Sequence, residues 1–206
     1  MSEPDPPQQP TDPLLPRLQQ LEQQVARLAD QLQELRQTLL LVGDVQRFSR
    51  LRALLAAGEL DAADQETARL LQDQLDTSAD GLSPEALERC PAAPLQIIDA
   101  LWQDASGGRQ GFCAQQQLYR GLGGSRDSLV RQDLELFHRF SAEVGWPLVP
   151  GVGFALPEEL SVPVPTALDA EGRPAAGHLP LRCWATDYGL KAANLLMARL
   201  IEVFAP

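Results

Sequence analysis

The chain of 206 residues has few side chains suited to catalysis, with three cysteines, two histidines and one lysine. An odd number of cysteines with no Cys-x-x-Cys spacing argues against a disulfide framework and against a zinc site. Because His138 and His178 are the only histidines, activation of Cys113 as a nucleophile would require one of them to reach it across the fold. We therefore interpret Cys113 as a packing residue and expect neither enzymatic activity nor a metal site.

Basic residues are also scarce, 17 against 28 acidic ones, and the formal net charge is −11. This balance argues against nonspecific binding to nucleic acids or anionic membranes. No apolar run approaches the roughly 20 residues that a membrane-spanning helix requires. The first residues have neither the basic-then-apolar order of a secretory signal nor the acid-poor composition of a transit peptide, so we expect a cytoplasmic protein.

The N-terminal part of the sequence divides into two segments. Residues 1–16 contain six prolines among polar residues, and we expect them to form a disordered tail. Residues 17–43 carry an apolar seam with a 3.5-residue period, which is typical of one coiled-coil-like helix. The seam consists of Leu18, Leu21, Val25, Leu28, Leu32, Leu35, Leu39 and Val42. It either packs on the rest of the chain or pairs with a second copy, which would give a homodimer through residues 18–42.

Residues 44–206 are expected to form one all-α domain, because no pattern of four to eight alternating residues recurs. Apolar spacing predicts helices at about 44–57, 61–74 and 190–204. Asp61 and Ser83 are candidate N-caps, the second of them followed by a first-turn proline. Seven prolines between residues 147 and 180 exclude a long helix there and predict a long loop, a feature that often wraps a ligand.

Ser128 is a further candidate N-cap, and we expect it to begin a longer helix that Gly145 ends. Val130, Leu134, Phe137 and Val144 would share one face of this helix.

The stretch from Ile98 to Gly124 is the strongest candidate for a binding loop. Two apolar helical patterns flank a turn rich in glycine, and Arg109, Phe112 and Tyr119 lie in or beside it. Gly121 is expected to end the second helix in the left-handed conformation. Loop residues held between rigid elements are where function concentrates.

Five sequence segments, in order and with similar spacing, resemble the genomes uncoupled four family. They are Phe48, Leu51, Leu54, Leu55, Ala57 and Gly58; Ala63, Asp64, Glu66, Thr67, Leu70 and Leu71; Asp99, Leu101, Trp102, Ser106, Gly108, Arg109, Gly111, Phe112, Gln115 and Tyr119; Val144, Gly145 and Trp146; and Gly177, His178, Leu179 and Pro180. The sequence departs from the family at Gln110, where the family has an aromatic residue, at Cys113, where it has serine, and at Pro147, where a basic residue is common.

The resemblance implies a non-enzymatic regulator that binds protoporphyrin IX or Mg-protoporphyrin IX without a covalent bond. Such a protein would stimulate magnesium chelatase in chlorophyll biosynthesis by handling its substrate or product. The implied partner is the large, porphyrin-binding subunit, with direct contact left open. The setting would be a cyanobacterial-type cytoplasm, with peripheral membrane association left open. The implied fold is a compact helical tetrapyrrole-binding domain with a long proline-rich loop.

A porphyrin is a flat apolar disc with two propionates, so its site requires aromatic surface and cations at one edge. Between residues 106 and 140 the chain has five arginines against three acidic residues. Arg109 and Arg120 are the candidates for the propionates. The candidate aromatic contacts are Phe112, Phe137, Phe140 and Trp146, with Trp146 forming a wall for the macrocycle. His178 is a candidate axial ligand of magnesium.

Two alternatives remain open at this point. In one, the chain is a divergent interaction or signalling module that binds porphyrin weakly or not at all and oligomerises through its N-terminal helix, and Gln110 and Cys113 favour it. In the other, the chain is a stress regulator that binds a bilin instead of a porphyrin.

Overall fold

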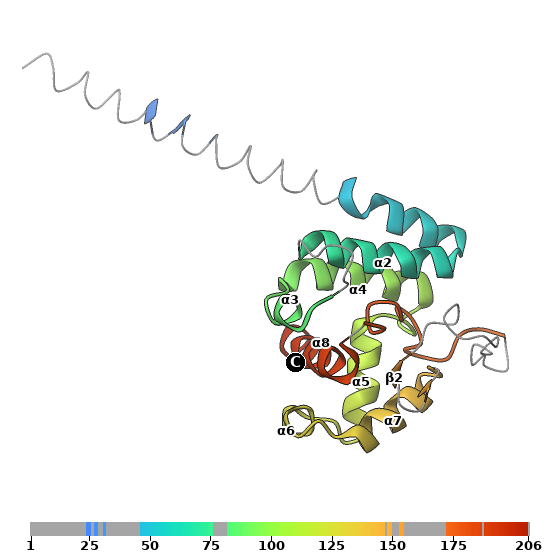
Figure 1. Cartoon of the computed structure of the whole chain (residues 1–206). Coiled ribbons are helices and arrows are strands. Elements are labelled where there is room, and N and C mark those ends of the chain that lie inside the picture. Colours follow the sequence, from blue (N-terminus) through green and yellow to red (C-terminus); the bar gives the residue numbers. More distant parts are fainter. Residues whose placement is uncertain are drawn as a thin grey trace, which may run out of the picture. The chain divides into compact units, whose positions relative to one another are not determined.

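The computed structural model describes residues 46–75, 82–146, 172–186 and 188–205, the backbone of 148–149 and 153–154, and residues 24, 25, 27, 28 and 31 (Figure 1). The chain divides into two compact units, Met1–Gln46 and Arg47–Pro206. In the first unit the described residues, 24, 25, 27, 28, 31 and 46, are helical. The predicted tail at 1–16 and most of the predicted helix at 17–43 lie outside the described residues.

The second unit is helical, which confirms the predicted all-α class. Its helices are 46–57, α2 (Leu60–Gln74), α3 (Pro84–Glu88), α4 (Ala92–Ser106), α5 (Phe112–Gly121), α6 (Arg126–Val130), α7 (Leu134–Glu143) and α8 (Gly189–Val203). Two short strands, β1 (Leu148–Val149) and β2 (Gly153–Phe154), form an antiparallel pair in the proline-rich region. No helix in the part of the chain that the structure describes is long and apolar enough to cross a membrane.

Helix α8 lies at the centre of the domain and packs against α3, α4, α5 and α6, while α2 contacts α4 and α5 contacts α7 (Figure 1). The largest fully buried side chains are Trp102, Trp184, Tyr119, Phe112 and Phe140. They come from α4, α5, α7 and the segment before α8, so one core connects the elements that flank the predicted binding loop.

Helix α3 begins as predicted. The Ser83 Oγ accepts a hydrogen bond from the Ala86 N–H, and Pro84 occupies the first turn. Asp61 is not an N-cap, because α2 already begins at Leu60. The Asp61 carboxylate instead accepts hydrogen bonds from the Gln65 amide and the Arg182 guanidinium.

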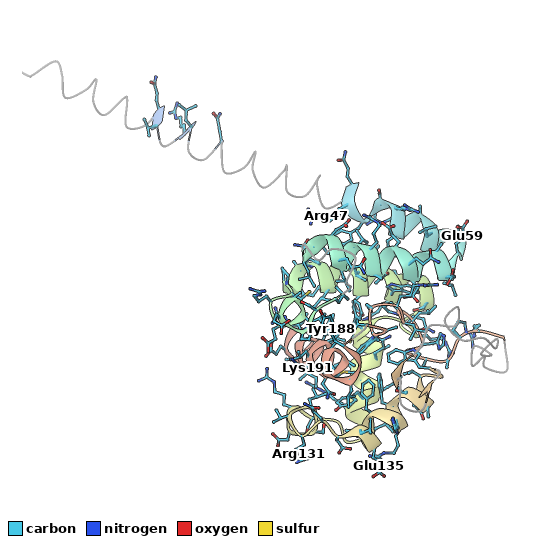
Figure 2. The ribbon with its side chains drawn as sticks, viewed as in Figure 1. Arg47, Glu59, Arg131, Glu135, Tyr188 and Lys191 are labelled. Atoms are coloured by element: carbon cyan, nitrogen blue, oxygen red, sulfur yellow. The ribbon has the colours of Figure 1, made fainter. Side chains whose placement is uncertain are left out.

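The prediction of a single helix that begins at Ser128 is wrong. Ser125 caps α6, and Asp133 caps a separate helix, α7. Between them Gln132 has a φ of 51°, a left-handed conformation that breaks the helix. Because of this break Val130 and Leu134 do not share a buried face with Phe137, and they are 82% and 51% exposed. Figure 2 shows Arg131 and Glu135, in the same region, pointing away from the domain.

Helix α5 does not end in a left-handed Gly121, which is its last helical residue. The left-handed conformation falls on Gly123, with a φ of 92°. A Cβ on Gly124 would clash with the Tyr119 ring, so these glycines form a tight turn against α5.

A buried carboxylate, Asp64 of α2, holds the segment that leads to α8. It accepts hydrogen bonds from the N–H groups of Leu181 at 2.9 Å and Arg182 at 3.1 Å. Burial raises the pKa of the Asp64 carboxyl from 3.8 to about 7, although the Arg182 and Leu181 N–H groups and the Arg182 guanidinium favour the charged form. The folded domain therefore binds a proton that the unfolded chain releases at lower pH.

This proton makes the stability depend on pH. The contribution of Asp64 is fully present below about pH 4 and is lost as the pH rises through about 7. Between these values the free energy of unfolding should fall by up to about 1.4 kcal/mol per pH unit, the slope of one proton. Urea unfolding at several pH values should show a flatter slope for Asp64→Asn than for the parent or for the exposed control Asp104→Asn. Equal slopes in both variants would contradict this role.

Candidate functional site

The turn between α4 and α5 adopts backbone conformations that favour glycine. Gly107, Gly108 and Gly111 have φ values of 63°, 81° and 113°. A Cβ on Gly111 would lie 2.6 Å from the Asp99 Oδ1, an oxygen that accepts the N–H of Cys113 at 2.8 Å. Asp99 of α4 therefore caps the N-terminus of α5, where Gly111 has no side chain to do so. Burial raises the pKa of Asp99, and its hydrogen bonds oppose that shift.

Backbone and side-chain hydrogen bonds join this turn to residues 174–180. The Gly177 N–H donates to the Arg109 carbonyl at 2.8 Å, and the Gly111 N–H donates to the Leu179 carbonyl at 2.9 Å. Gln110 is 5% exposed; its amide oxygen accepts the Leu179 N–H at 2.8 Å and its amide nitrogen donates to Ala175 at 2.9 Å. The glutamine that departs from the family pattern thus fixes the two segments to each other.

Gln115 of α5 makes a second connection that the sequence did not single out for this role. Its amide nitrogen donates to the carbonyls of Gly177 at 3.0 Å and Pro180 at 2.9 Å. Its amide oxygen accepts the Trp184 Nε1–H at 3.1 Å, and the side chain has no exposed surface. Gln115 shares a helix face with Phe112 and Tyr119, and this spacing is the sequence signal that could have indicated its buried position.

A hollow of about 530 Å³ lies beside these connections, along α5, and we call it the α5 hollow. Its lining consists of Gly108, Arg109, Ala114, Gln117, Leu118, Gly121, Leu122, Glu143 and Ala176. Ala114, Leu118 and Leu122 follow each other at four-residue spacing, so they form one apolar stripe along the helix. Gly108 and Gly121 add no side chain. Arg109 and Glu143 supply charges of opposite sign.

Of the two arginines predicted for the site, Arg109 lines the α5 hollow. Its Nη2 donates to the Pro174 carbonyl at 3.4 Å. Arg120 is exposed and is not among the lining residues, because it projects from a different side of α5.

The structure places the other five predicted site residues, Phe112, Phe137, Phe140, Trp146 and His178, in the core. The Trp146 ring packs on Phe140 and on Trp184 with centroid distances of 5.3 Å, and its Nε1–H donates to the His178 carbonyl at 2.7 Å. The protein's own side chains thus surround the ring. None of the five lines the α5 hollow, so their contact with a macrocycle, including the aromatic wall at Trp146, stays a prediction.

His178 itself is 7% exposed, and its Nδ1 lies 2.8 Å from the Val144 carbonyl oxygen. Burial lowers the pKa of His178, which the bond to Val144 partly offsets. A buried ring bonded to the backbone fits a structural role better than the predicted axial one. Among the described residues no group of three or more histidine, cysteine or acidic side chains could hold a metal ion.

The geometry is that of a helical domain in which two connected segments and α5 border a hollow with an apolar stripe, Arg109 and Glu143. The model of the GUN4-like family matches residues 43–194, and the chain belongs to this family. The family is the genomes uncoupled four family of the sequence analysis, whose members are tetrapyrrole-binding regulators, and membership supports that general role. The predicted family is thereby confirmed.

A solved structure is also similar to the chain, the ligand-free GUN4 of Arabidopsis thaliana. The two share 22% sequence identity with a TM-score of 0.54, over 78% of this chain and 95% of the Arabidopsis chain. At this identity the likeness establishes the fold. A comparison with curated protein sequences found no match.

Proposed function

We propose that the protein is a non-enzymatic regulator that binds protoporphyrin IX or Mg-protoporphyrin IX without a covalent bond and stimulates magnesium chelatase in chlorophyll biosynthesis. The observation that carries the proposal is the α5 hollow with Arg109 at its edge, in a chain of this family. The partner would be the large, porphyrin-binding subunit of the chelatase. The setting would be a cyanobacterial-type cytoplasm, and membrane association would be peripheral where it occurs.

The lining of the α5 hollow suits a flat apolar ligand. Its volume of about 530 Å³ lies within the roughly 300–1,000 Å³ of small-molecule sites. One face of the macrocycle would lie on the stripe of Ala114, Leu118 and Leu122, and the glycines of the lining allow the ring to approach the backbone. Arg109 would donate to a propionate, and repulsion by Glu143 would turn the propionates away from α7.

Replacing Arg109 by alanine should weaken tetrapyrrole binding. A charge-assisted hydrogen bond to a carboxylate is worth about 1.5–3 kcal/mol, so the dissociation constant should rise by about one to two orders of magnitude. The measurement is an absorbance and tryptophan-quenching titration with Mg-protoporphyrin IX. Arg120→Ala is the matched control, because Arg120 is exposed on the same helix and does not line the α5 hollow.

Each outcome of this titration is informative. A loss confined to Arg109→Ala supports the site, whereas equal affinity in both variants would exclude Arg109 from it. If the parent protein shifts neither the absorption band nor its fluorescence, the rival interaction module is the better description. A biliverdin titration separates the bilin alternative, which differs in its ligand alone.

The homodimer through residues 18–42 remains part of the proposal. It is supported by two seam residues that the structure describes, Val25 and Leu28, which are 65% and 58% exposed. Exposed apolar positions at coiled-coil spacing favour pairing with a second copy.

A further inference from the structure

Among the described residues that line the α5 hollow, Glu143 is the acidic one. It is the last residue of α7, and it is exposed. No other residue in the part of the chain that the structure describes makes an ion pair or a hydrogen bond with its carboxylate. The carboxylate is therefore available to a ligand that enters the hollow.

Glu143 lies beside the middle of the apolar stripe. A Cβ on Gly177 would lie 2.8 Å from the Leu118 side chain and 3.2 Å from that of Val144, so these two side chains converge on this glycine. Leu118 is the central residue of the stripe, and Val144 follows Glu143 directly. Glu143 therefore borders the hollow near the centre of the surface on which the macrocycle would lie.

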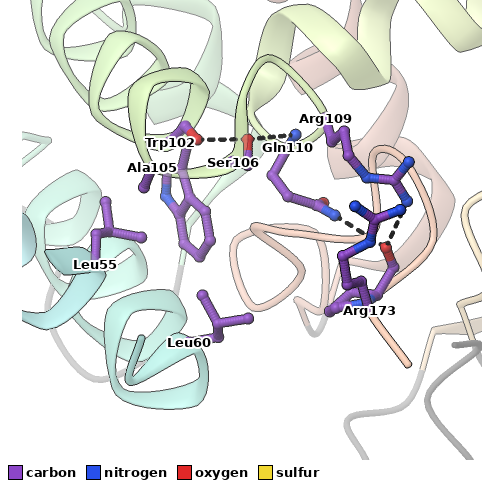
Figure 3. A pocket seen from close by; sticks show the side chains of 9 residues that line it. Leu55, Leu60, Trp102, Ala105, Ser106, Arg109, Gln110 and Arg173 are labelled. Carbon is purple, nitrogen blue, oxygen red and sulfur yellow. Dashed lines mark hydrogen bonds between the residues drawn. The ribbon is translucent and has the colours of Figure 1, made fainter. Parts of the chain in front are cut away.

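The cation of the hollow lies elsewhere, in the turn before α5 begins. Figure 3 shows the Arg109 guanidinium beside that of Arg173, with the hydrogen bond from Arg109 to the Pro174 carbonyl at 3.4 Å. The propionates belong to the edge of the macrocycle, and Arg109 would hold that edge at the turn. The centre of the ring would then lie further along α5, towards Glu143.

The oxygen atoms of the lining fit magnesium. Mg²⁺ prefers oxygen ligands in octahedral geometry, and the ring nitrogens of a porphyrin leave its axial positions open. The side-chain oxygens of the described lining belong to Glu143 and Gln117, and no imidazole or thiol occurs among these residues. The Gln117 amide is neutral, and its nitrogen donates to the Cys113 Sγ at 3.3 Å. The carboxylate of Glu143 is thus the stronger ligand for a divalent cation.

The two porphyrins of the proposed function differ in what they offer to this carboxylate. A macrocycle over the hollow removes water from Glu143, and a carboxylate that loses water without gaining a partner costs free energy. Metal-free protoporphyrin IX has no cation at its centre, whereas Mg-protoporphyrin IX offers one to an oxygen ligand. The lining therefore opposes the first ligand and favours the second.

We propose that Glu143 determines the ligand of the α5 hollow: its carboxylate binds the magnesium of Mg-protoporphyrin IX axially and so selects this ligand over metal-free protoporphyrin IX. The inference rests on the proposed function and names which of its two porphyrins the site prefers.

The test is a tryptophan-quenching titration of the full chain with each porphyrin, in the parent protein and in Glu143→Gln, which keeps the size and removes the charge. The parent should bind Mg-protoporphyrin IX about tenfold or more tightly than protoporphyrin IX, the order expected of one charged contact. In Glu143→Gln the two porphyrins should bind about equally. The same preference in parent and variant would overturn the proposal, and so would a parent that does not prefer the magnesium form.

Absorption spectra of the bound porphyrins add a signature of ligation. In Glu143→Ala, which offers no oxygen, the band of bound Mg-protoporphyrin IX should shift relative to the parent, while the band of bound protoporphyrin IX should stay in place. An unshifted magnesium band would contradict axial ligation. Because Glu143 is exposed, both variants should fold, and circular dichroism checks this.

The matched control is Glu135→Gln. Glu135 is an exposed acid of the same helix, it does not line the α5 hollow, and Figure 2 shows it pointing away from the domain. This variant should keep the preference of the parent. Arg109→Ala should weaken both porphyrins by a similar factor, since both carry the same propionates.

The titrations also separate this inference from the proposed function. A parent protein that binds neither porphyrin contradicts the proposed function, and this inference falls with it. Binding of both porphyrins with a preference that Glu143→Gln leaves unchanged contradicts this inference alone.

Discussion

The variant Gln115→Leu should be less stable than the parent protein by about 4 kcal/mol or more. Leucine removes the partner of three buried groups, the carbonyls of Gly177 and Pro180 and the Trp184 Nε1–H. Each buried polar group left without a partner costs about 1–3 kcal/mol. Leucine is close to glutamine in size, so the loss reports the hydrogen bonds rather than a cavity. The measurement is the free energy of unfolding in urea.

The matched control is Gln117→Leu, because Gln117 lies two residues away on α5 and is exposed. Its effect should stay within about 0.5 kcal/mol, as for most surface substitutions. If Gln115→Leu were as mild as this control, the connection between α5 and residues 177–184 would not contribute to stability.

The variant Trp146→Ala should lose about 3–5 kcal/mol, the range for a large aromatic side chain removed from a core. The Trp146 side chain is 4% exposed and contacts two other rings, Phe140 and Trp184. Trp146→Phe keeps a ring in this position and loses the hydrogen bond to the His178 carbonyl, so it should cost about 1–3 kcal/mol. Urea unfolding of both variants measures the difference.

Trp146→Phe also distinguishes a core residue from a wall of the ligand site. Because the Trp146 ring does not line the α5 hollow, the folded variant should bind Mg-protoporphyrin IX as tightly as the parent protein. A loss of affinity in a variant with normal circular dichroism would show that the macrocycle contacts this ring.

The helices could be predicted from the sequence where one apolar period is uninterrupted. This holds for α2 and α8, whose buried residues recur on one face, and for the cap at Ser83. The prediction failed between α6 and α7, because the apolar spacing of Val130, Leu134 and Phe137 continues through Gln132. A single left-handed residue changes the direction of the chain without changing the hydrophobic pattern.

The candidate site was harder to predict for a physical reason. An aromatic side chain leaves water in the same way whether it contacts a ligand or its own core, so sequence alone does not separate the two roles of Phe140 or Trp146. The prediction of Arg109 rests on a cation in a glycine-rich turn, and the structure places this residue on the lining of the α5 hollow. Gln110 and Gln115 donate hydrogen bonds to backbone carbonyls more than 60 positions away in the sequence. A local sequence pattern does not reveal partners at that distance.

The central claim is that a tetrapyrrole lies on the apolar stripe of α5, and methyl NMR tests it most directly. The ring current of a porphyrin shifts the resonances of protons that lie over its face. On addition of protoporphyrin IX, the methyl groups of Ala114, Leu118 and Leu122 should show the largest upfield shifts, and those of Leu55 and Leu60 should stay in place. Large shifts at Leu55 and Leu60 with none on α5, or no shift at all, would contradict the account.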